Sequence, residues 1–150
     1  MRTGYKVCDL MTLRPVSVDP STPVDECSRI MAKNHVGSLL IRKGTRLLGL
    51  FTEKDIVRKV VASNRDPRKV SAKEVMKYRY PTITPEKDIY DAIVLMRDKN
   101  VRQLPVVDKK KIVGFLTGKD ILKIQPQLFE LLVDKIELRE EDRKLKELNI

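Results

Sequence analysis

Two similar phrases in the sequence hold the residue types that could do chemistry. Residues 49–56 read GLFTEKDI and residues 114–121 read GFLTGKDI, so each phrase has a threonine followed three residues later by an aspartate. A threonine before a helix and an acidic residue at its third position form a capping box, in which both side chains bind free backbone N–H groups. The same hydroxyl and carboxylate could instead hold a ligand. The residues alone leave both interpretations open.

The other reactive side chains form no further catalytic or metal-binding pattern. No Ser/His/Asp arrangement, phosphate-binding glycine loop or zinc signature is visible. His35 is the only histidine and follows a predicted helix, where an imidazole can interact with the helix dipole. Cys8 and Cys27 form no Cys-x-x-Cys pair, and we expect two reduced core thiols. These observations predict a protein that is not an enzyme and holds no metal.

The two phrases belong to a tandem repeat. A shift of 65 residues aligns the two halves of the chain without a gap. The identical pairs in this register number eleven: Met11/Met76, Arg14/Arg79, Pro20/Pro85, Met31/Met96, Val36/Val101, Leu39/Leu104, Gly49/Gly114, Thr52/Thr117, Lys54/Lys119, Asp55/Asp120 and Ile56/Ile121. Self-similarity at a fixed period is the signature of a repeated structural unit. We therefore expect two copies of one unit.

Each copy is predicted to have the element order β-α-β-β-α, which gives an α+β fold. The assignments rest on β-prone runs ended by proline and on apolar residues at helical spacing. In chain order, with the second copy's counterpart, the predicted elements are strands at 16–18 and 82–84, helices with apolar residues at 24, 27 and 31 and at 89, 92 and 96, strands at 38–41 and 103–107, strands at 46–52 and 111–117, and helices beginning at Glu53 and Gly118.

The copies define the predicted domain boundaries. We expect the first repeat at residues 1–62, a polar linker at 63–69 and the second repeat at 70–124. About 50 residues of this pattern bury too little surface alone, so the copies are predicted to pack together with pseudo-twofold symmetry. Residues 125–150 place apolar side chains in a heavily charged background and are predicted to form a C-terminal amphipathic helix.

The composition is that of a globular protein with a basic surface. The 150 residues carry a formal net charge of +10, and 41% are apolar. Nine basic residues stand against three acidic ones between Lys54 and Arg79, a run that suits phosphate or nucleic acid but is also typical of a solvated surface. No apolar run approaches the roughly 20 residues that cross a bilayer, and no secretory signal is visible. We expect a cytoplasmic protein without a membrane segment.

Together these features resemble the cystathionine beta-synthase (CBS) domain family, and the pair resembles the tandem arrangement called a Bateman module. The resemblance covers roughly residues 7–124. It rests on motifs that occur in order in the chain: Asp9-Leu10-Met11 and Glu74-Val75-Met76, Pro20 and Pro85, Val101-Arg102-Gln103-Leu104-Pro105-Val106-Val107, and the phrases GLFTEKDI and GFLTGKDI.

The resemblance implies an adenosyl ligand in clefts between the repeats: an adenine nucleotide such as AMP, ADP or ATP, with S-adenosylmethionine or NAD(H) as alternatives. A carboxylate has two acceptor oxygens, so Asp55 or Asp120 could hold both hydroxyls of a ribose. The hydroxyls of Thr52 and Thr117, with the free N–H groups that open each helix, favour a phosphate.

Carried over residue by residue, the resemblance implies two sites. Site A consists of Thr52, Asp55, Thr82, Ile83, Arg102, Pro105 and Lys119. Site B consists of Ser17, Val18, Leu40, Lys54, Thr117 and Asp120. Site A is predicted to read phosphate, because its Arg102 is a multidentate phosphate partner whose counterpart in site B is Gly37. Leu40 stands where site A has Pro105, a second departure that weakens the prediction for site B.

The predicted function is a regulatory, ligand-sensing module. An adenine nucleotide would tie the copies together and change the surface shown to a regulated protein, which the sequence does not identify. By resemblance, the chain is expected to form a homodimer. The alternative is a nucleic-acid-binding or scaffold protein that uses the basic surface. An aromatic content of 5% and the lack of tryptophan offer few stacking platforms for that alternative.

Overall fold

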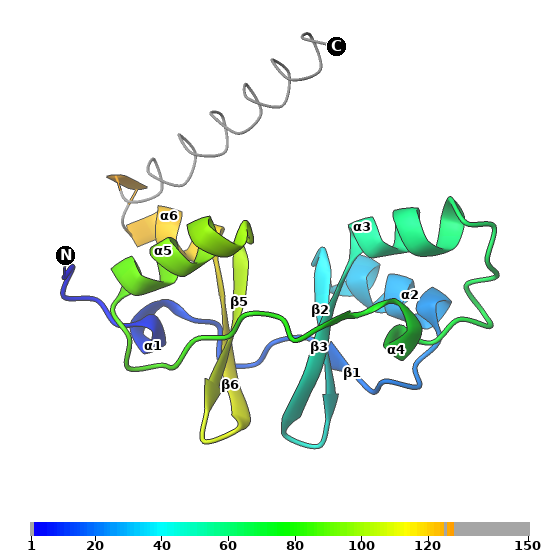
Figure 1. Ribbon diagram of the computed structural model, residues 1–150, viewed down its shortest axis with the longest axis horizontal. Helices are drawn as coiled ribbons and strands as arrows, with labels where there is room; N and C mark the ends of the chain where they lie inside the picture. Colours follow the sequence, from blue (N-terminus) through cyan, green and yellow to red (C-terminus); the bar gives the residue numbers. More distant parts are fainter. Residues whose placement is uncertain (1, 125, 128–150) are drawn as a thin grey trace, which may run out of the picture. The chain divides into compact units, whose positions relative to one another are not determined.

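The chain forms two compact units, and each unit draws on both repeats (Figure 1). The structure, a computed structural model, describes residues 2–124, 126 and 127. Of these, unit 1 takes the residues within Met1–Thr12, Pro81–Val106 and Gly114–Ile150, and unit 2 takes Leu13–Tyr80 and Val107–Val113. The segment that opens each repeat therefore belongs to the unit that contains the helices of the other repeat.

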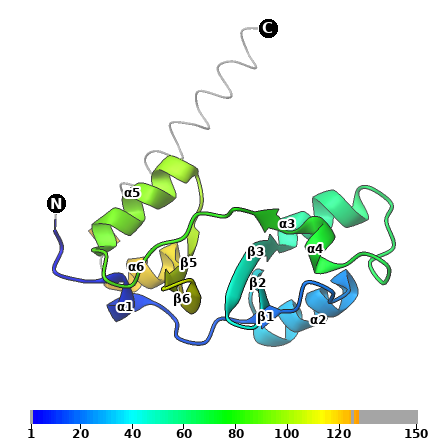
Figure 2. The same ribbon diagram turned by 60° about the horizontal axis from the view of Figure 1, so that its bottom comes forward.

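Unit 2 is built on a sheet with the strand order β1-β2-β3-β4. The strands are β1 (Ser17–Val18), β2 (Ser38–Lys43), β3 (Arg46–Thr52) and β4 (Lys77–Tyr78). β1 is parallel to β2, whereas β3 is antiparallel to β2 and to β4. On one side of this sheet lie the helices α2 (Val24–Asn34), α3 (Glu53–Ile56), its π-helical continuation η1 (Val57–Val61) and α4 (Ala72–Val75) (Figures 1 and 2).

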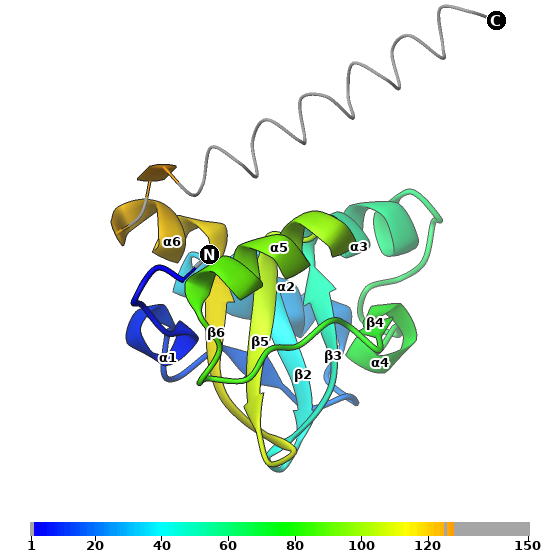
Figure 3. The ribbon, with the colours of Figure 1, turned by 60° about the vertical axis from the view of Figure 1, so that its left-hand side comes forward.

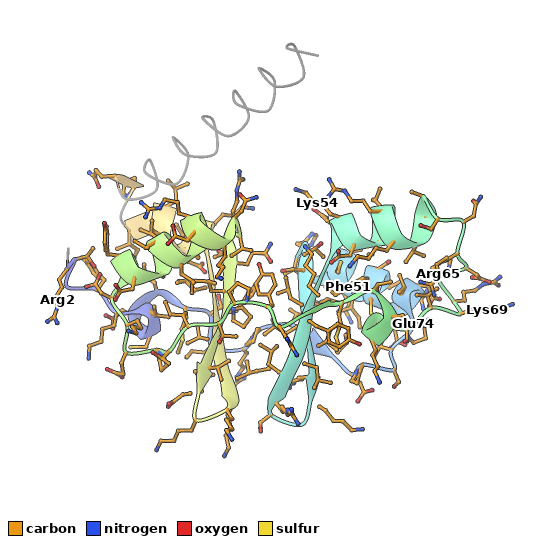
Figure 4. All side chains as sticks on the ribbon, in the orientation of Figure 1. Arg2, Phe51, Lys54, Arg65, Lys69 and Glu74 are labelled. Atoms are coloured by element: carbon orange, nitrogen blue, oxygen red, sulfur yellow. The ribbon has the colours of Figure 1, made fainter. Side chains whose placement is uncertain are left out.

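The core of unit 2 lies between the sheet and these helices. Leu39 and Ile41 alternate with Leu40 along β2, so they share the face that packs on α2. Phe51 of β3 is fully buried in the same cluster (Figure 4). The α2 residues in the cluster are those predicted from helical spacing: Val24, Cys27 and Met31. Burial of each such side chain stabilises the fold by roughly 1.5–3 kcal/mol.

Unit 1 has the same architecture with fewer regular strand pairs. Its hairpin is formed by β5 (Gln103–Asp108) and β6 (Lys111–Thr117). The residues at the turn of this hairpin, Val107–Val113, are assigned to unit 2. The helices α1 (Val7–Leu10), α5 (Ile89–Lys99) and α6 (Gly118–Ile124) lie on one side of the hairpin (Figure 2). Two single bridges take the places of β1 and β4: Ile83 with Val106, and Thr12 with Phe115. The strand predicted at 82–84 is reduced to one bridge because prolines stand on both sides of it.

The opening segment of each repeat forms a short helix that non-local contacts hold in place. In unit 1 the N–H of Val7 donates to the carbonyl of Lys87 at 2.8 Å. In unit 2 the N–H of Ala72 donates to the carbonyl of Thr22, also at 2.8 Å. Figure 3 shows α1 beside β6 and α4 beside β3. Helices of four residues are too short to be stable alone, so these hydrogen bonds determine where they form.

The predicted α+β fold and repeat order are confirmed. β3 and β6 have the predicted bounds, and α3 and α6 begin at the predicted residues. His35 ends α2 at its C-cap with a left-handed φ of 54°. The helix predicted over 125–150 lies outside the described residues except for 126 and 127. Across the part of the chain that the structure describes, no helix is long and apolar enough to span a membrane.

The two thiols are expected to differ in reactivity. Cys27 is fully buried, and this burial, with Glu26 nearby, raises the pKa of its thiol to about 11. Cys8 is only partly buried. Because the thiolate is the reactive form, a thiol reagent near pH 8 should modify Cys8 rapidly and Cys27 only on unfolding. The count of fast-reacting thiols should fall from one to zero in Cys8→Ser. A fast phase that survives this substitution would contradict the buried position of Cys27.

Candidate functional site

Both Thr-x-x-Asp phrases form the capping box that the sequence allows. The N–H of Thr52 donates to Asp55 Oδ2 at 2.9 Å, and the Thr52 hydroxyl donates to the same oxygen at 3.0 Å. The N–H of Asp55 donates to Thr52 Oγ1 at 3.3 Å. Thr117 and Asp120 make the same three hydrogen bonds at 2.9, 3.0 and 3.3 Å. The cap therefore uses only one oxygen, Oδ2, of each carboxylate.

The second oxygen of Asp55 faces two lysines. Asp55 is the one buried charged residue among those described, with its side chain 5% exposed. Lys59 Nζ lies 3.4 Å from Asp55 Oδ1, and Lys77 Nζ lies 3.9 Å from it. Lys59 is one helical turn further along, a spacing that favours an ion pair with an acid, and it also donates to the carbonyl of Val75 at 2.9 Å. Asp55 thus links the start of α3 to the segment around β4.

Tyr80 belongs to the same cluster. Burial, followed by the nearby charge of Asp55, raises the pKa of its phenol to about 12. Tyr80 lies two residues after the end of β4 and is partly buried. A phenolate beside a buried carboxylate would place two like charges together in a poorly solvated region, which disfavours ionisation.

The titration of Tyr80 provides a test of this cluster. Its folded pKa of about 12 lies above the unfolded value of about 10, so the unfolded chain ionises first. Folding stability should therefore be unaffected below about pH 10 and fall as the pH rises toward 12. Ultraviolet difference absorbance should show a late-titrating phenol that Tyr80→Phe removes. In Asp55→Asn that phenol should titrate earlier. An unchanged titration in Asp55→Asn would contradict the proximity of the two groups.

The surroundings of Asp120 differ from those of Asp55. Asp120 is partly exposed, and no ion pair joins it to any other described residue. The repeat register places Ile124 and Thr12 at the positions of Lys59 and Lys77. Both replacements are uncharged, so among the described residues no such cation pairs with Asp120.

The starts of α3 and α6 also differ in charge. The N–H of Glu53 donates to the Gly37 carbonyl at 3.0 Å, and the N–H of Gly118 donates to the Arg102 carbonyl at 2.9 Å. In unit 2 the Glu53 carboxylate lies over Gly37, where an added Cβ would be 3.2 Å from its Oε1. Unit 2 therefore has Gly37 and Glu53 at these two positions, whereas unit 1 has their repeat counterparts Arg102 and Gly118. The pair is acidic in unit 2 and basic in unit 1. Arg102 and Lys119 are both exposed.

The structure divides the residues predicted for sites A and B between the units. Unit 2 contains Ser17, Val18, Leu40, Thr52, Lys54 and Asp55. Unit 1 contains Thr82, Ile83, Arg102, Pro105, Thr117, Lys119 and Asp120. Within unit 2, Ser17 pairs with Leu40 across β1 and β2, and exposed Lys54 points away from the core (Figure 4). Within unit 1, the N–H of Ile83 donates to the Pro105 carbonyl at 3.1 Å. Sites A and B each take residues from both units and stay predictions.

Four residues near the two phrases were not predicted from the sequence. Lys59 could have been found from its spacing to Asp55, but Lys77 and Tyr80 are brought there by the β3–β4 pairing. Gln103 begins β5, and its Oε1 is buried without a hydrogen-bond partner among the described residues. Such an atom usually indicates a missing donor.

The basic segment between Lys54 and Arg79 uses part of its charge internally. Besides Lys59 and Lys77, Arg65 pairs with Glu74 at 2.9 Å (Figure 4), and Arg68 pairs with Asp66 at 3.1 Å. Four of the nine basic side chains are therefore held by acids of unit 2. This reduces the charge that the segment offers to a polyanion.

Comparison with known proteins places these features in a family. The model of the CBS domain matches residues 7–62 and again residues 72–126. An uncharacterized protein of Methanopyrus kandleri is 30% identical over 129 residues, which are 85% of this chain and 66% of that protein. The CBS domain-containing protein YhcV of Bacillus subtilis is 30% identical over 115 residues, which are 77% of this chain and 81% of that protein.

Among solved structures, the CBS domain pair of protein MJ0100 is similar to this chain. That crystal structure is a complex with 5′-methylthioadenosine and S-adenosyl-L-methionine. The similarity has a TM-score of 0.72 and a sequence identity of 25%, over 80% of this chain and 94% of the other. The chain therefore belongs to the CBS domain family and carries two CBS domains in tandem, a regulatory ligand-binding module.

Proposed function

We propose that the chain senses an adenosyl ligand, which the Thr-x-x-Asp phrases bind through the ribose. The observation that supports this most is that the helix cap uses only one of the two oxygens of each carboxylate. The capping box engages Oδ2 of Asp55 and of Asp120, so the helix cap does not use Oδ1. A ribose offers two adjacent hydroxyl donors, and a carboxylate can accept both. The cap and the ligand site are therefore compatible functions of the same residues.

The structurally similar MJ0100 pair supports the choice of ligand class. Both ligands in that complex contain an adenosine. For this chain we propose AMP, ADP or ATP, with S-adenosylmethionine and NAD(H) as alternatives that share the adenosine. Arg102 and Lys119 are exposed cations that belong, together with Asp55, to the proposed site A, and they suit a phosphate. The residue sets of sites A and B are part of this proposal.

The direct experiment is a ligand screen on the intact chain. Thermal shift with AMP, ADP, ATP, NADH and S-adenosylmethionine should show stabilisation by at least one adenosyl ligand, since a ligand that binds only the folded state raises its stability. GMP serves as the control for phosphate without adenine. Calorimetric titration then gives the affinity and stoichiometry. Absence of any shift, or equal shifts with GMP, would contradict the proposal.

The proposed output is regulation rather than catalysis. A ligand that binds one arrangement of the chain more tightly than another shifts the population toward that arrangement. The changed surface would then act on a partner or on the chain's own assembly. The nucleic-acid alternative has weaker support, because four of the nine basic side chains in the segment are paired with acids. It would gain support from tight DNA or RNA binding that falls steeply with salt.

Self-association through apolar helix surfaces is the second part of the proposal. Val57 and Val61 are 58% and 64% exposed one turn apart, and Leu122, the repeat counterpart of Val57, is 43% exposed. Val57 also lines an open depression of about 430 Å³. We propose that these side chains contact a second copy of the chain, because exposed apolar patches mark interaction surfaces.

Substitution of both valines should separate the copies. Sedimentation velocity should show a dimer for the unmodified chain and a monomer for Val57→Glu/Val61→Glu. Leu13→Glu is the matched control, since Leu13 is 71% exposed but lies outside these helices. The same mass for the unmodified chain and the double variant would contradict this surface as the dimer contact.

A further inference from the structure

The free oxygen of each carboxylate has a different environment in the two units. Asp55 Oδ1 is covered by the ammonium groups of Lys59 at 3.4 Å and Lys77 at 3.9 Å. Asp120 Oδ1 has no such neighbour among the described residues, because the repeat places Ile124 and Thr12 at the corresponding positions. The atom proposed to accept a ribose hydroxyl is thus already paired with ammonium groups in unit 2, whereas in unit 1 no described residue forms an ion pair with it.

A ribose that binds Asp55 must compete with these ammonium groups. The Asp55 carboxylate is 5% exposed, and removing the partner of a buried charge is costly. The lysine side chains are 43% and 46% exposed, so their ends can move without unpacking the core. A ligand that also brings an anion gives the displaced ammonium groups a new partner. A ligand without an anion leaves them unpaired.

We propose that phosphate selects between the two phrases: Asp55, with Lys59 and Lys77, takes phosphate-bearing adenosyl ligands, whereas Asp120 takes adenosyl ligands without phosphate. This inference rests on the proposed function and adds the ligand class of each phrase. When a phosphate-bearing ligand binds at Asp55, no charged group loses its partner. The carboxylate accepts hydrogen bonds from the ribose hydroxyls in place of the ammonium groups, and the two lysines pair with the phosphate in place of the carboxylate. At Asp120 no ammonium group of the described residues has to leave, so neutral adenosine or a sulfonium ligand meets no such barrier there.

Lys59 and Lys77 are therefore specificity-determining residues. Both are placed by elements that adjoin the phrase, since η1 continues α3 and β4 pairs with β3. Lys59 donates to the Val75 carbonyl at 2.9 Å, and the pairing of β4 with β3 places Lys77 opposite Leu50. Charge-assisted bonds to phosphate are among the stronger polar contacts in proteins. Loss of the two lysines should therefore change the ratio of the affinities for AMP and adenosine. A general loss of stability would not change this ratio.

The test separates the two phrases by substitution and compares AMP with adenosine by calorimetry. In Asp120→Asn, which leaves the Asp55 phrase intact, AMP should bind at least about tenfold more tightly than adenosine. Adding Lys59→Met/Lys77→Met should lower this ratio several-fold, and Arg102 and Lys119 of the proposed site A account for the preference that remains. Arg58→Met is the matched control, because Arg58 is an exposed cation of η1 with no ion pair to Asp55, and it should leave the ratio unchanged. In Asp55→Asn, adenosine and S-adenosylmethionine should bind at least as tightly as AMP.

Each outcome has a defined meaning. Equal affinities for AMP and adenosine in Asp120→Asn, or a ratio that the loss of both lysines leaves unchanged, would overturn the inference while leaving adenosyl binding in place. No binding of any adenosyl ligand to the unmodified chain would overturn the proposed function and the inference together. If the double lysine variant does not fold, Lys77→Gln alone should give an intermediate ratio, and an unchanged ratio would overturn the inference.

Discussion

Replacing Gly49 by alanine should destabilise the fold by about 1–3 kcal/mol or more, the range for overpacking a tight contact. An added Cβ would lie 2.6 Å from the Lys77 carbonyl oxygen and 2.9 Å from Met76 Sδ. The carbonyl belongs to the backbone of β4, so relief requires β3 and β4 to separate. Chemical denaturation should report the loss as a lower unfolding midpoint.

The repeat supplies both a second test and a control for this prediction. Gly114, the counterpart of Gly49, would place a Cβ 2.5 Å from Met11 Sδ and 3.0 Å from the Thr12 carbonyl oxygen. Gly114→Ala should therefore also destabilise the chain. In Gly37→Ala the new Cβ meets only the flexible Glu53 carboxylate at 3.2 Å, and the loss should be within about 0.5 kcal/mol. Equal stability of all three variants would contradict the close approach of the opening segments to β3 and β6.

Removing the charge of both phrase aspartates should abolish adenosyl binding while the fold persists. In Asp55→Asn/Asp120→Asn each side chain keeps an oxygen that can accept the capping hydrogen bonds, and a cap contributes only about 1 kcal/mol. A hydrogen bond to a charged group contributes roughly 1.5–3 kcal/mol. Loss of two such bonds to a ribose should therefore weaken binding about a hundredfold or more.

Calorimetric titration and circular dichroism together check this second prediction. The unmodified chain should bind at least one adenosyl ligand, and the double variant should keep its helical signal without measurable heat of binding. Thr52→Ser/Thr117→Ser is the matched control, because serine also caps a helix and keeps the hydroxyl. A double aspartate variant that binds as well as the unmodified chain would show that the phrases are helix caps only.

Local signals predicted most of the fold. The main helices and strands could be predicted close to their observed bounds. The signals were the repeat register, the apolar spacing of Val24, Cys27 and Met31, and the threonine that ends the second strand of each hairpin. These elements depend on periodicity and capping within a few residues. What the sequence did not reveal depends on distant contacts. The short helices α1 and α4 and the strand β4 form only because carbonyls and strand edges elsewhere in the chain receive them.

The same distinction applies to the candidate site. The capping box of Thr52 and Asp55 is encoded in four consecutive residues, so its geometry could be predicted. The approach of Lys77 to Asp55 spans 22 positions in the sequence (77 minus 55) and depends on the pairing of Leu50 with Lys77. No pattern of residue types indicates that contact. The difference between Asp55 and Asp120 was therefore not visible from the two nearly identical phrases.

A crystal structure of the chain with AMP and adenosine tests the central claim most directly, because it shows which atoms hold the ribose. The account predicts that the two ribose hydroxyls lie within about 3 Å of a carboxylate oxygen of Asp55 or Asp120, hydrogen-bond distance for an O–H donor. A ligand bound elsewhere, or a ribose that makes no contact with either aspartate, would contradict it.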